Sequence, residues 1–174
     1  MKTETTLVIG GCRSGKSRHA MDLAEQVNGN RKIYVATCVP MDEEMRQRVA
    51  RHQAERGPGW QTVETPLAIG PCIERSSAKA DVILVDCLTL WTSNLMGEGR
   101  DQETILAQAE ELGRILETVQ CPVMLVSNEV GTGIVPENRM ARQFRDIAGL
   151  VNQTIAGACS RVVWMVAGIP MAVK

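Results

Sequence analysis

The chain has 174 residues, a formal net charge of −1, and a composition of 44% hydrophobic and 22% charged residues. This length suits one well-buried domain, so we expect a single domain over residues 1–174. The near-neutral charge and the aromatic content of 3% argue against a long nucleic acid as partner, because such partners select basic surfaces and stacking rings.

The cysteines and the N-terminus bear on the compartment of the protein. Six cysteines are scattered along the chain without a C-x-x-C pair or a histidine pair at zinc spacing, which argues against a metal cluster or a disulfide framework. The chain begins without a charged and then apolar leader, and no apolar run approaches the ~20 residues of a membrane-spanning helix. We therefore expect a cytoplasmic protein without a membrane span.

The first predicted element is a strand over residues 6–9, and a phosphate-binding pattern follows it directly. The pattern G-x-x-x-x-G-K-[ST], a P-loop, is matched by Gly10, Gly11, Cys12, Arg13, Ser14, Gly15, Lys16 and Ser17. A helix is expected over residues 17–27, so bound phosphate would also lie at a helix N-terminus. Lys16 would place a positive charge near the β and γ phosphates, and Ser17 would offer its hydroxyl to Mg²⁺. The alternative is a glycine-rich turn without a ligand.

The rest of the chain alternates predicted strands with predicted helices. Strands are expected at 32–36, 60–64, 81–86, 121–127 and 161–166, and helices at about 42–56, 69–77, 105–119 and 136–158. The apolar residues from Leu88 to Leu95 could form a loop or a helix. This alternation predicts an α/β fold with a mostly parallel central sheet and helices on both faces.

Ligands of such sheets bind beyond the carboxyl ends of the strands. Polar or small residues follow several predicted strands: the P-loop, Ala36 to Cys38, Asp86, and Asn128 with Glu129. These segments should converge on one crevice. Asp86 ends a buried strand, where a magnesium ion on nucleotide phosphates needs a carboxylate. An acid that merely ends the strand is the alternative, but the P-loop favours the magnesium role.

His52 lies four residues from both Arg48 and Arg56 on the predicted helix 42–56, so the three side chains share one face. Two positive neighbours keep an imidazole neutral and nucleophilic near pH 7, and both arginines can hold phosphate oxygens. A phosphoramidate-forming nucleophile fits this pattern. Spacing alone favours the alternatives, a plain surface histidine near Glu55 or one packed against apolar neighbours.

Other polar residues are expected to be structural. His19, on the helix after the P-loop, is interpreted as structural. Three arginines and an aspartate of the last helix lie off its apolar stripe, which predicts a solvated charged face. They are Arg139, Arg142, Arg145 and Asp146.

Several of these motifs, taken together, resemble one protein family over essentially the whole chain. They are the P-loop with Arg18, residues 34–37, residues 42–45 leading to His52, residues 62–64, residues 128–131 through 134–136, and residues 138–139, 144–146 and 149–153. The chain resembles the bifunctional adenosylcobinamide kinase / adenosylcobinamide-phosphate guanylyltransferase family of cobalamin biosynthesis. The resemblance implies a three-layer P-loop NTPase-type fold.

The resemblance also implies two reactions. In the first, ATP or GTP phosphorylates the hydroxyl of the aminopropanol arm of adenosylcobinamide, a corrinoid. In the second, GTP forms a covalent guanylyl-histidine and releases pyrophosphate, and GMP passes to the corrinoid phosphate to give adenosylcobinamide-GDP. By this likeness, His52 carries the guanylyl group. Lys16 stabilises the negative charge on the transferred phosphate or on the leaving pyrophosphate.

The expected site thus has catalytic, nucleotide-binding and metal-binding residues. The catalytic residues are His52 and Lys16, and the Mg²⁺ ligands are Ser17 and Asp86. The nucleotide-binding residues are Gly10, Gly11, Cys12, Arg13, Ser14, Gly15, Lys16, Ser17, Ala36, Thr37, Cys38, Arg48, Gln53, Ala54, Glu55, Arg56, Glu64 and Asp86. Glu64 could recognise guanine by accepting hydrogen bonds from the N–H groups of the base. Cys12 and Cys38 depart from the small residues expected there.

The resemblance further implies a homo-oligomer, since the family usually forms trimers. Two other hypotheses remain open. One is an ordinary P-loop small-molecule kinase, in which His52 is a surface residue and no covalent intermediate forms. The other is a nucleotide-dependent switch whose loops signal to a protein partner.

Overall fold

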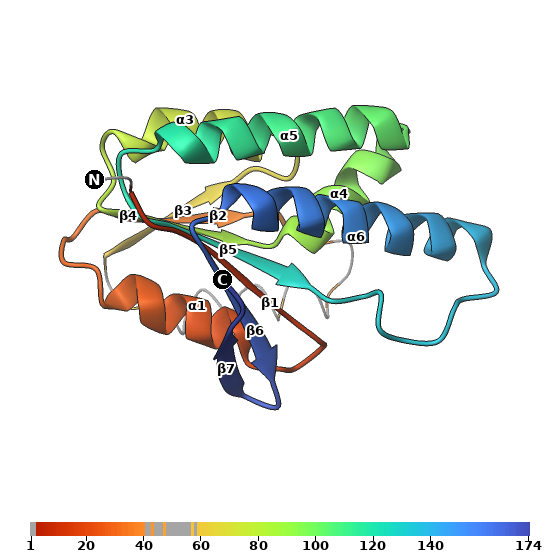
Figure 1. Cartoon of the computed structure of the whole chain (residues 1–174). Coiled ribbons are helices and arrows are strands. Elements are labelled where there is room, and N and C mark those ends of the chain that lie inside the picture. The colour runs from red at the N-terminus through yellow and green to blue at the C-terminus, as the bar shows by residue number, and fades with distance from the viewer. Residues whose placement is uncertain (1–2, 41–42, 44–46, 48–56, 58) are drawn as a thin grey trace.

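The computed structural model describes residues 3–40, 43, 47, 57 and 59–174, and a seven-stranded sheet lies at its centre (Figure 1). The strand order is β3-β2-β4-β5-β1-β6-β7, in which β7 pairs antiparallel with β6 and all other pairs are parallel. The strands are β1 (Thr5–Gly10), β2 (Lys32–Ala36), β3 (Trp60–Glu64), β4 (Val82–Asp86), β5 (Val123–Asn128), β6 (Arg161–Val166) and β7 (Ile169–Ala172). The predicted α/β fold with a mostly parallel sheet is confirmed.

The last strand, β7, was not predicted. It follows β6 through a tight turn at Ala167 and Gly168, whose φ angles are 50° and 85°. Two successive positive φ angles match the twist of a hairpin turn. Pro170 lies within β7. Proline argues against a strand in the sequence, although it is tolerated on strands at the edge of a sheet, where β7 lies.

Helices cover both faces of the sheet. The described helices are α1 (Lys16–Glu25), α3 (Ile69–Ser77), α4 (Leu88–Gly97), α5 (Gln102–Thr118) and α6 (Arg139–Ala158). The open question over residues 88–95 is thus answered by a helix. Of the predicted helix 42–56, only Glu43 and Gln47 are described, and both are helical. No helix in the described ranges is long and apolar enough to cross a bilayer.

The start of α6 corrects one expectation. Pro136 was expected in the first turn of this helix, but α6 begins at Arg139. Asn138 is the N-cap residue, and its side-chain oxygen accepts a hydrogen bond from the Ala141 N–H at 3.1 Å. An asparagine in this position satisfies an N–H group that has no partner within the helix, and therefore fixes the helix start.

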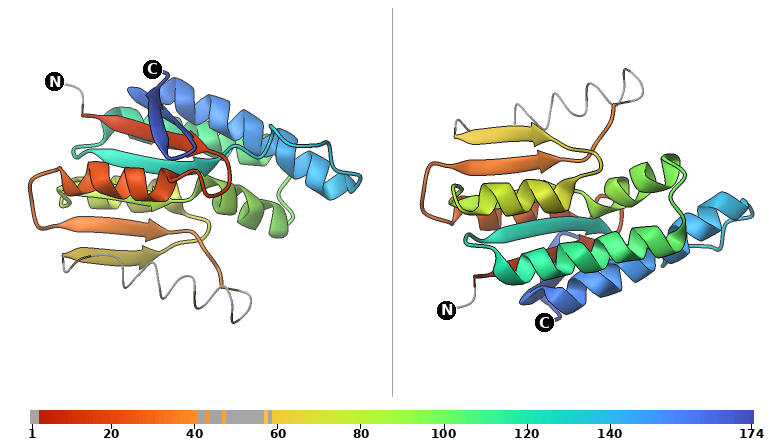
Figure 2. Two further views of the ribbon diagram at one scale, coloured as in Figure 1. Left: turned by 90° about the horizontal axis from the view of Figure 1, so that it is seen from below. Right: turned by 90° about the horizontal axis from the view of Figure 1, so that it is seen from above.

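The two views in Figure 2 show helices on both faces of the sheet. An apolar core fills the space between the sheet and the helices on each face. One core contains Leu7 of β1 and packs beneath α3, α4, α5 and α6. The other contains Val8 of the same strand and packs against α1 through Ala20 and Ala24. Successive strand residues point to opposite faces, so a continuous apolar strand can fill both cores.

Candidate functional site

The P-loop has the backbone shape of an anion cradle. Arg13 and Gly15 have φ angles of 56° and 89°, which turn successive N–H groups toward one side. A Cβ added to Gly10 would lie 2.6 Å from both the Met165 carbonyl oxygen and Ser14 Oγ, so only glycine fits there. Gly10 is therefore required because a side chain has no space there, and Gly15 because its φ angle is positive.

The start of α1 leaves this cradle open to an anion. Gly15 is the N-cap residue and makes no side-chain capping bond, and the first turn carries no acidic residue. The first N–H groups of the helix therefore lack an intrahelical partner, and the positive end of the helix dipole is not neutralised. Lys16 Nζ donates to the Gly11 carbonyl oxygen at 3.0 Å, which keeps the ammonium over the loop. These groups suit the phosphates of a nucleotide.

Two neighbouring segments support the P-loop through the backbone. The Glu129 N–H donates to the Gly10 carbonyl oxygen at 3.0 Å, and the Gly168 N–H donates to the Ser14 carbonyl oxygen at 3.1 Å. Gly168 belongs to the β6–β7 turn, which sequence reasoning missed. A glycine between two apolar runs was the only available signal of this turn, and Pro170 obscured it.

The carboxyl ends of β2, β3 and β4 place three predicted site residues in one row. Ala36 is in register with Glu64 on one side and with Asp86 on the other. Asp86 Oδ2 accepts a hydrogen bond from the Tyr34 hydroxyl at 3.1 Å, which orients this carboxylate. Glu64 is exposed at the end of the edge strand. The expected convergence of strand ends at this edge is therefore present.

The corner between β4 and α4 is tied to the end of β2 by Thr37. The Thr37 hydroxyl accepts from the Cys87 N–H at 2.7 Å and donates to the Cys87 carbonyl oxygen at 2.9 Å. Asn94 Nδ2 donates to the Thr37 carbonyl oxygen at 2.8 Å, and the Asp86–Cys87 peptide is cis. Thr37 is fully buried, so its side chain holds the corner beside Asp86. Its contact with a nucleotide stays a prediction.

The thiol of Cys87 is expected to be unreactive at neutral pH. Burial, together with the neighbouring Asp86 carboxylate, raises the pKa of Cys87 to about 12. The thiolate is the reactive form of cysteine, so this side chain stays protonated and unreactive at neutral pH. Cys12, by contrast, is exposed on the P-loop.

A polar network fixes the end of β5 against α4 and α6. Ser127 Oγ donates to Asn152 Oδ1 at 2.6 Å, Asn152 Nδ2 donates to the Asn128 carbonyl oxygen at 3.2 Å, and the Asn128 N–H donates to Thr89 Oγ1 at 2.7 Å. Asn128 Oδ1 is buried and has no hydrogen-bond partner among the described residues. An open acceptor therefore remains one strand away from the P-loop, because Asn128 is in register with Gly10.

Several of the predicted residues are not described by the structure. His52, with Arg48, Gln53, Ala54, Glu55 and Arg56, lies outside the described residues, and their roles stay predictions. His19 is half-buried on α1, and its Nε2 has no hydrogen-bond partner within the described part. A cavity of about 420 Å³, lined partly by Arg31, Arg75 and Lys79, lies near the amino ends of β2 and β3. This cavity is at the opposite end of the strands from the P-loop.

Metal binding at the carboxyl edge would have to rely on few protein ligands. Among the described residues, no group of three or more His, Cys, Asp or Glu side chains could hold a metal ion. Zinc sites usually need such a group, whereas Mg²⁺ takes one or two carboxylates together with water and substrate phosphates. Ser17 and Asp86 are of this second kind.

Comparison with known proteins bears on the whole chain. The sequence model of the family described as cobinamide kinase / cobinamide phosphate guanyltransferase matches residues 6–173. The match begins in β1 and ends beyond β7, so it includes the P-loop, the row of strand ends and the C-terminal hairpin.

Three curated bacterial proteins are similar over nearly their full length. The bifunctional adenosylcobalamin biosynthesis protein CobP of Pseudomonas aeruginosa is 41% identical, over 97% of this chain and 96% of the relative. Two proteins called bifunctional adenosylcobalamin biosynthesis protein CobU are 42% identical in Salmonella typhimurium and 38% identical in Escherichia coli. Each covers 97% of this chain and 98% of the relative.

Proposed function

The chain belongs to the cobinamide kinase / cobinamide phosphate guanyltransferase family, and from this premise we propose how its residues serve two reactions. It is a transferase of cobalamin biosynthesis with a kinase and a guanylyltransferase activity. The observation that carries the residue assignments is the P-loop cradle, which lies at the same sheet edge as the Asp86 carboxylate. This arrangement suits one nucleoside triphosphate site used in both reactions.

In the kinase reaction, the hydroxyl oxygen of the aminopropanol arm attacks the γ phosphorus of ATP or GTP. A P–O bond forms to this oxygen, the bond to the β–γ bridging oxygen breaks, the nucleoside diphosphate leaves, and the hydroxyl proton passes to solvent. Lys16 and the N–H groups of the P-loop stabilise the charge on the β and γ phosphates. Phosphoryl transfer depends mainly on such positioning and charge stabilisation.

In the guanylyltransferase reaction, His52 is the proposed nucleophile. An imidazole nitrogen attacks the α phosphorus of GTP, a P–N bond forms, and the bond to the α–β bridging oxygen breaks to release pyrophosphate. A phosphate oxygen of the corrinoid phosphate then attacks the same phosphorus, which breaks the P–N bond and frees His52. Arg48 and Arg56 are proposed to hold phosphate oxygens. This assignment rests on the sequence pattern and the resemblance.

Glu64 is the proposed reader of guanine. Its carboxylate lies at the end of β3, in register with Ala36 at the same edge as Asp86. An ionised carboxylate accepts two hydrogen bonds side by side, and guanine offers two adjacent N–H donors. Ala36 lies in the same row, and Thr37 and Cys38 follow it in the chain. All three are proposed to contact the nucleotide.

Ser17 and Asp86 are the proposed protein ligands of Mg²⁺. The donor set fits this ion, since a hydroxyl and a carboxylate are hard oxygen ligands and the carboxylate is oriented by Tyr34. When bound, the ion neutralises charge on the phosphate oxygens. The chain's own part is to hold Asp86 in place through Tyr34 and the corner built by Thr37.

Labelling with GTP that carries radioactivity on the α phosphate tests the histidine assignment. We expect wild-type protein to take up label that is labile in acid and stable in base, as a phosphoramidate is, and His52→Ala to take up none. The chain has two histidines, so His19→Gln is the matched control and should label normally. A wild-type protein that phosphorylates cobinamide but takes up no label would favour a simple kinase without a covalent intermediate.

We also propose a homo-oligomer, with a trimer as the expected form. The cross-strand pairs Trp164–Met171 and Val166–Ile169 put four exposed apolar side chains on one face of β6 and β7. Contiguous apolar patches at a sheet edge are uncommon on monomers. Light scattering should give three chain masses, and a monomer at micromolar concentration would contradict the proposal.

A further inference from the structure

A second group of exposed apolar side chains lies apart from the β6–β7 face. Ile134, Val135 and Met140 are 96%, 63% and 71% exposed. They belong to a segment that we call the arm, residues 129–145, which comprises the loop after β5 and the first turns of α6. Figure 1 shows the arm extending beyond the sheet at the end where β5 stops.

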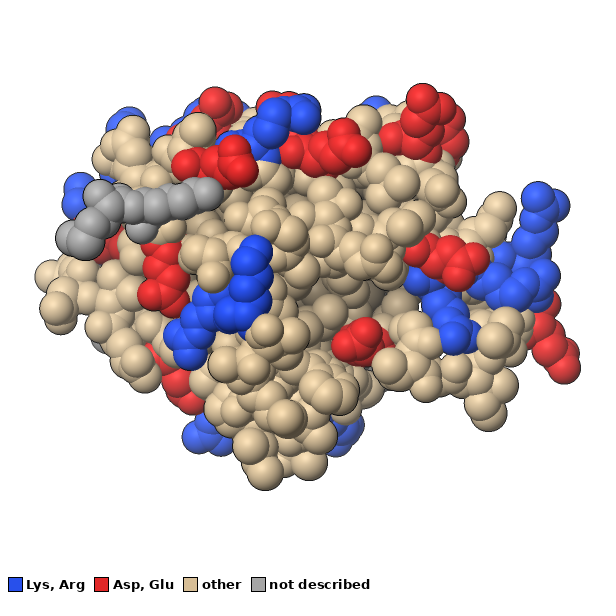
Figure 3. All heavy atoms as spheres, in the orientation of Figure 1, with Lys and Arg blue, Asp and Glu red and all other residues tan. Residues whose placement is uncertain are grey.

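The arm starts at the edge of the nucleotide site. Asn128, the last residue of β5, is in register with Gly10, and the Glu129 N–H donates to the Gly10 carbonyl oxygen at 3.0 Å. Figure 3 shows the surface hollowed between the main body and this projecting end, where basic side chains gather. The arm therefore borders one side of this hollow, from the P-loop outward.

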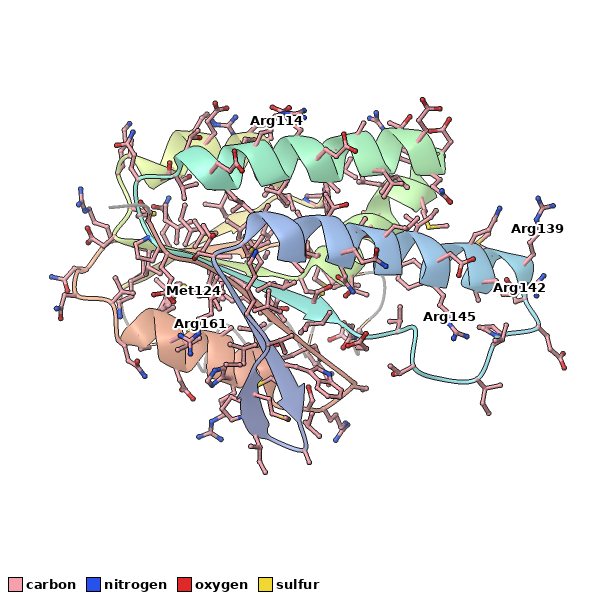
Figure 4. All side chains as sticks on the ribbon, viewed as in Figure 1. Arg114, Met124, Arg139, Arg142, Arg145 and Arg161 are labelled. Carbon is pink, nitrogen blue, oxygen red and sulfur yellow. The ribbon has the colours of Figure 1, made fainter. Side chains whose placement is uncertain are left out.

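Hydrogen bonds from α6 hold the loop of the arm in place. Arg145 Nη2 donates to the Gly131 carbonyl oxygen at 2.5 Å, and Arg142 Nη1 donates to the carbonyl oxygens of Pro136 and Glu137 at 3.0 and 2.5 Å. Figure 4 shows Arg145 pointing from the helix toward the loop. The expected solvated charged face of α6 is confirmed for Arg139, Arg142 and Asp146, which are exposed, whereas Arg145 is half-buried.

Arg145 also keeps an unused donor. Its Nη1 atom is buried and has no hydrogen-bond partner among the described residues. A buried N–H group without an acceptor is unfavourable, and a guanidinium in this state suits a carbonyl or phosphate oxygen from a ligand. The arm therefore combines exposed apolar side chains on a hydrogen-bonded loop with an unpaired donor.

We propose that the arm is the docking surface for the corrin macrocycle of cobinamide, an inference that rests on the proposed function. The P-loop cradle offers backbone N–H groups and one lysine, which suit phosphates but not a large ring system. The macrocycle has apolar edges that would cover Ile134, Val135 and Met140. Its amide side chains carry carbonyl oxygens that can accept from Arg145 Nη1. Met140 adapts its shape readily to such a surface.

The other candidate occupant, a second copy of the chain, fits β6 and β7 better. That face lies at the edge of the sheet and has two directly opposed apolar pairs, whereas the arm projects beside the P-loop (Figure 1). A macrocycle docked on residues 129–145 would also keep the aminopropanol group of the corrinoid near the nucleotide phosphates, as both reactions require.

The double variant Ile134→Ser/Val135→Ser tests the proposal in steady-state kinase assays of the full chain. Loss of two apolar contacts should raise KM for cobinamide by about tenfold or more and leave KM for the nucleotide within about twofold. Met140→Ser should raise KM for cobinamide several-fold. Val173→Ser is the matched control, since Val173 is 65% exposed and lies away from the arm, and its KM values should match wild type.

Self-labelling from GTP without corrinoid separates this inference from the proposed function. Normal labelling of the double variant with a raised KM for cobinamide supports docking of the macrocycle on the arm. Absence of labelling in wild type rejects the histidine intermediate, while the KM comparison still tests whether the macrocycle docks on the arm. An unchanged KM for cobinamide in the double variant overturns the proposal, and a changed oligomeric state with that unchanged KM assigns the arm to a second copy instead.

Discussion

Two corners at the carboxyl edge of the sheet are built in opposite ways. The P-loop corner between β1 and α1 takes its shape mainly from its own residues, Gly10 for space and Gly15 for conformation. The corner between β4 and α4 is held by side chains from another strand end, since Thr37 binds the backbone of Cys87 and Tyr34 binds Asp86. The first corner depends on local sequence and the second on tertiary contacts.

The difference matters for the proposed chemistry. The P-loop would bind phosphates wherever its own backbone is intact, whereas the position of Asp86 depends on the end of β2. Substitutions in the P-loop should therefore affect nucleotide binding, and substitutions at Thr37 should affect the metal-dependent step more than binding. Variants of the two corners can separate these effects.

Gly10→Ala should have the largest effect. The added Cβ would lie 2.6 Å from the Met165 carbonyl oxygen, a backbone atom of β6 that cannot move alone. We expect the free energy of unfolding to fall by about 3 kcal/mol, as for severe overpacking, and the affinity for GTP to fall by about tenfold or more. Denaturant unfolding and titration calorimetry measure the two quantities.

Gly11→Ala is the matched control for this prediction. An added Cβ at Gly11 meets no heavy atom within 4 Å in the part of the chain that the structure describes. Its free energy of unfolding should change by less than about 0.5 kcal/mol. Equal losses in both variants would show that the P-loop tolerates no Cβ at all, and the steric explanation for Gly10 would be wrong.

The same contrast explains what the sequence could predict. The bounds of β2 and β3 match their predicted ranges, because their apolar pattern and the nearby glycine or proline residues mark them locally. The bounds of α3 also match, although Gly70 and Pro71 within it argued against a helix. The P-loop was likewise recognised from its own residues. The tie between Thr37 and Cys87 could not be predicted, since it joins residues that are distant in sequence and leaves no local pattern. The support from Gly168 was missed for the same reason.

Thr37→Val should have an intermediate effect. Valine keeps the shape of threonine but removes the hydroxyl that accepts from the Cys87 N–H and donates to its carbonyl oxygen. The free energy of unfolding should fall by about 2 kcal/mol, because a buried N–H group loses its acceptor. The kinase kcat should fall as Asp86 shifts, while KM for the nucleotide stays near the wild-type value.

Thr37→Ser is the control for the hydroxyl, since serine can make both bonds with one methyl group fewer. It should recover most of the kcat lost in Thr37→Val. If the serine and valine variants lose equal activity, the missing methyl packing rather than the hydrogen bonds holds the corner, and the contrast with the P-loop would weaken.

The smallest effect should come from the two cysteines, one in each corner. Cys12 is exposed, whereas the pKa of Cys87 is raised to about 12 by burial and by the Asp86 carboxylate. Iodoacetamide at pH 8 should therefore modify Cys12 at least about tenfold faster than Cys87, because only the thiolate reacts. Mass spectrometry of peptides from the folded protein measures both rates, and GTP should slow the reaction of Cys12 alone.

The same raised pKa gives the sign of a pH effect on stability. The folded state favours the neutral Cys87 thiol, so this contribution is complete below the ordinary thiol pKa of 9.0 and is lost as the pH rises toward about 12. Relative to wild type, Cys87→Ala should lessen the alkaline loss of unfolding free energy by about 1 kcal/mol near pH 10. An identical alkaline slope in Cys87→Ala and wild-type protein would mean that the folded corner does not keep this thiol from ionising.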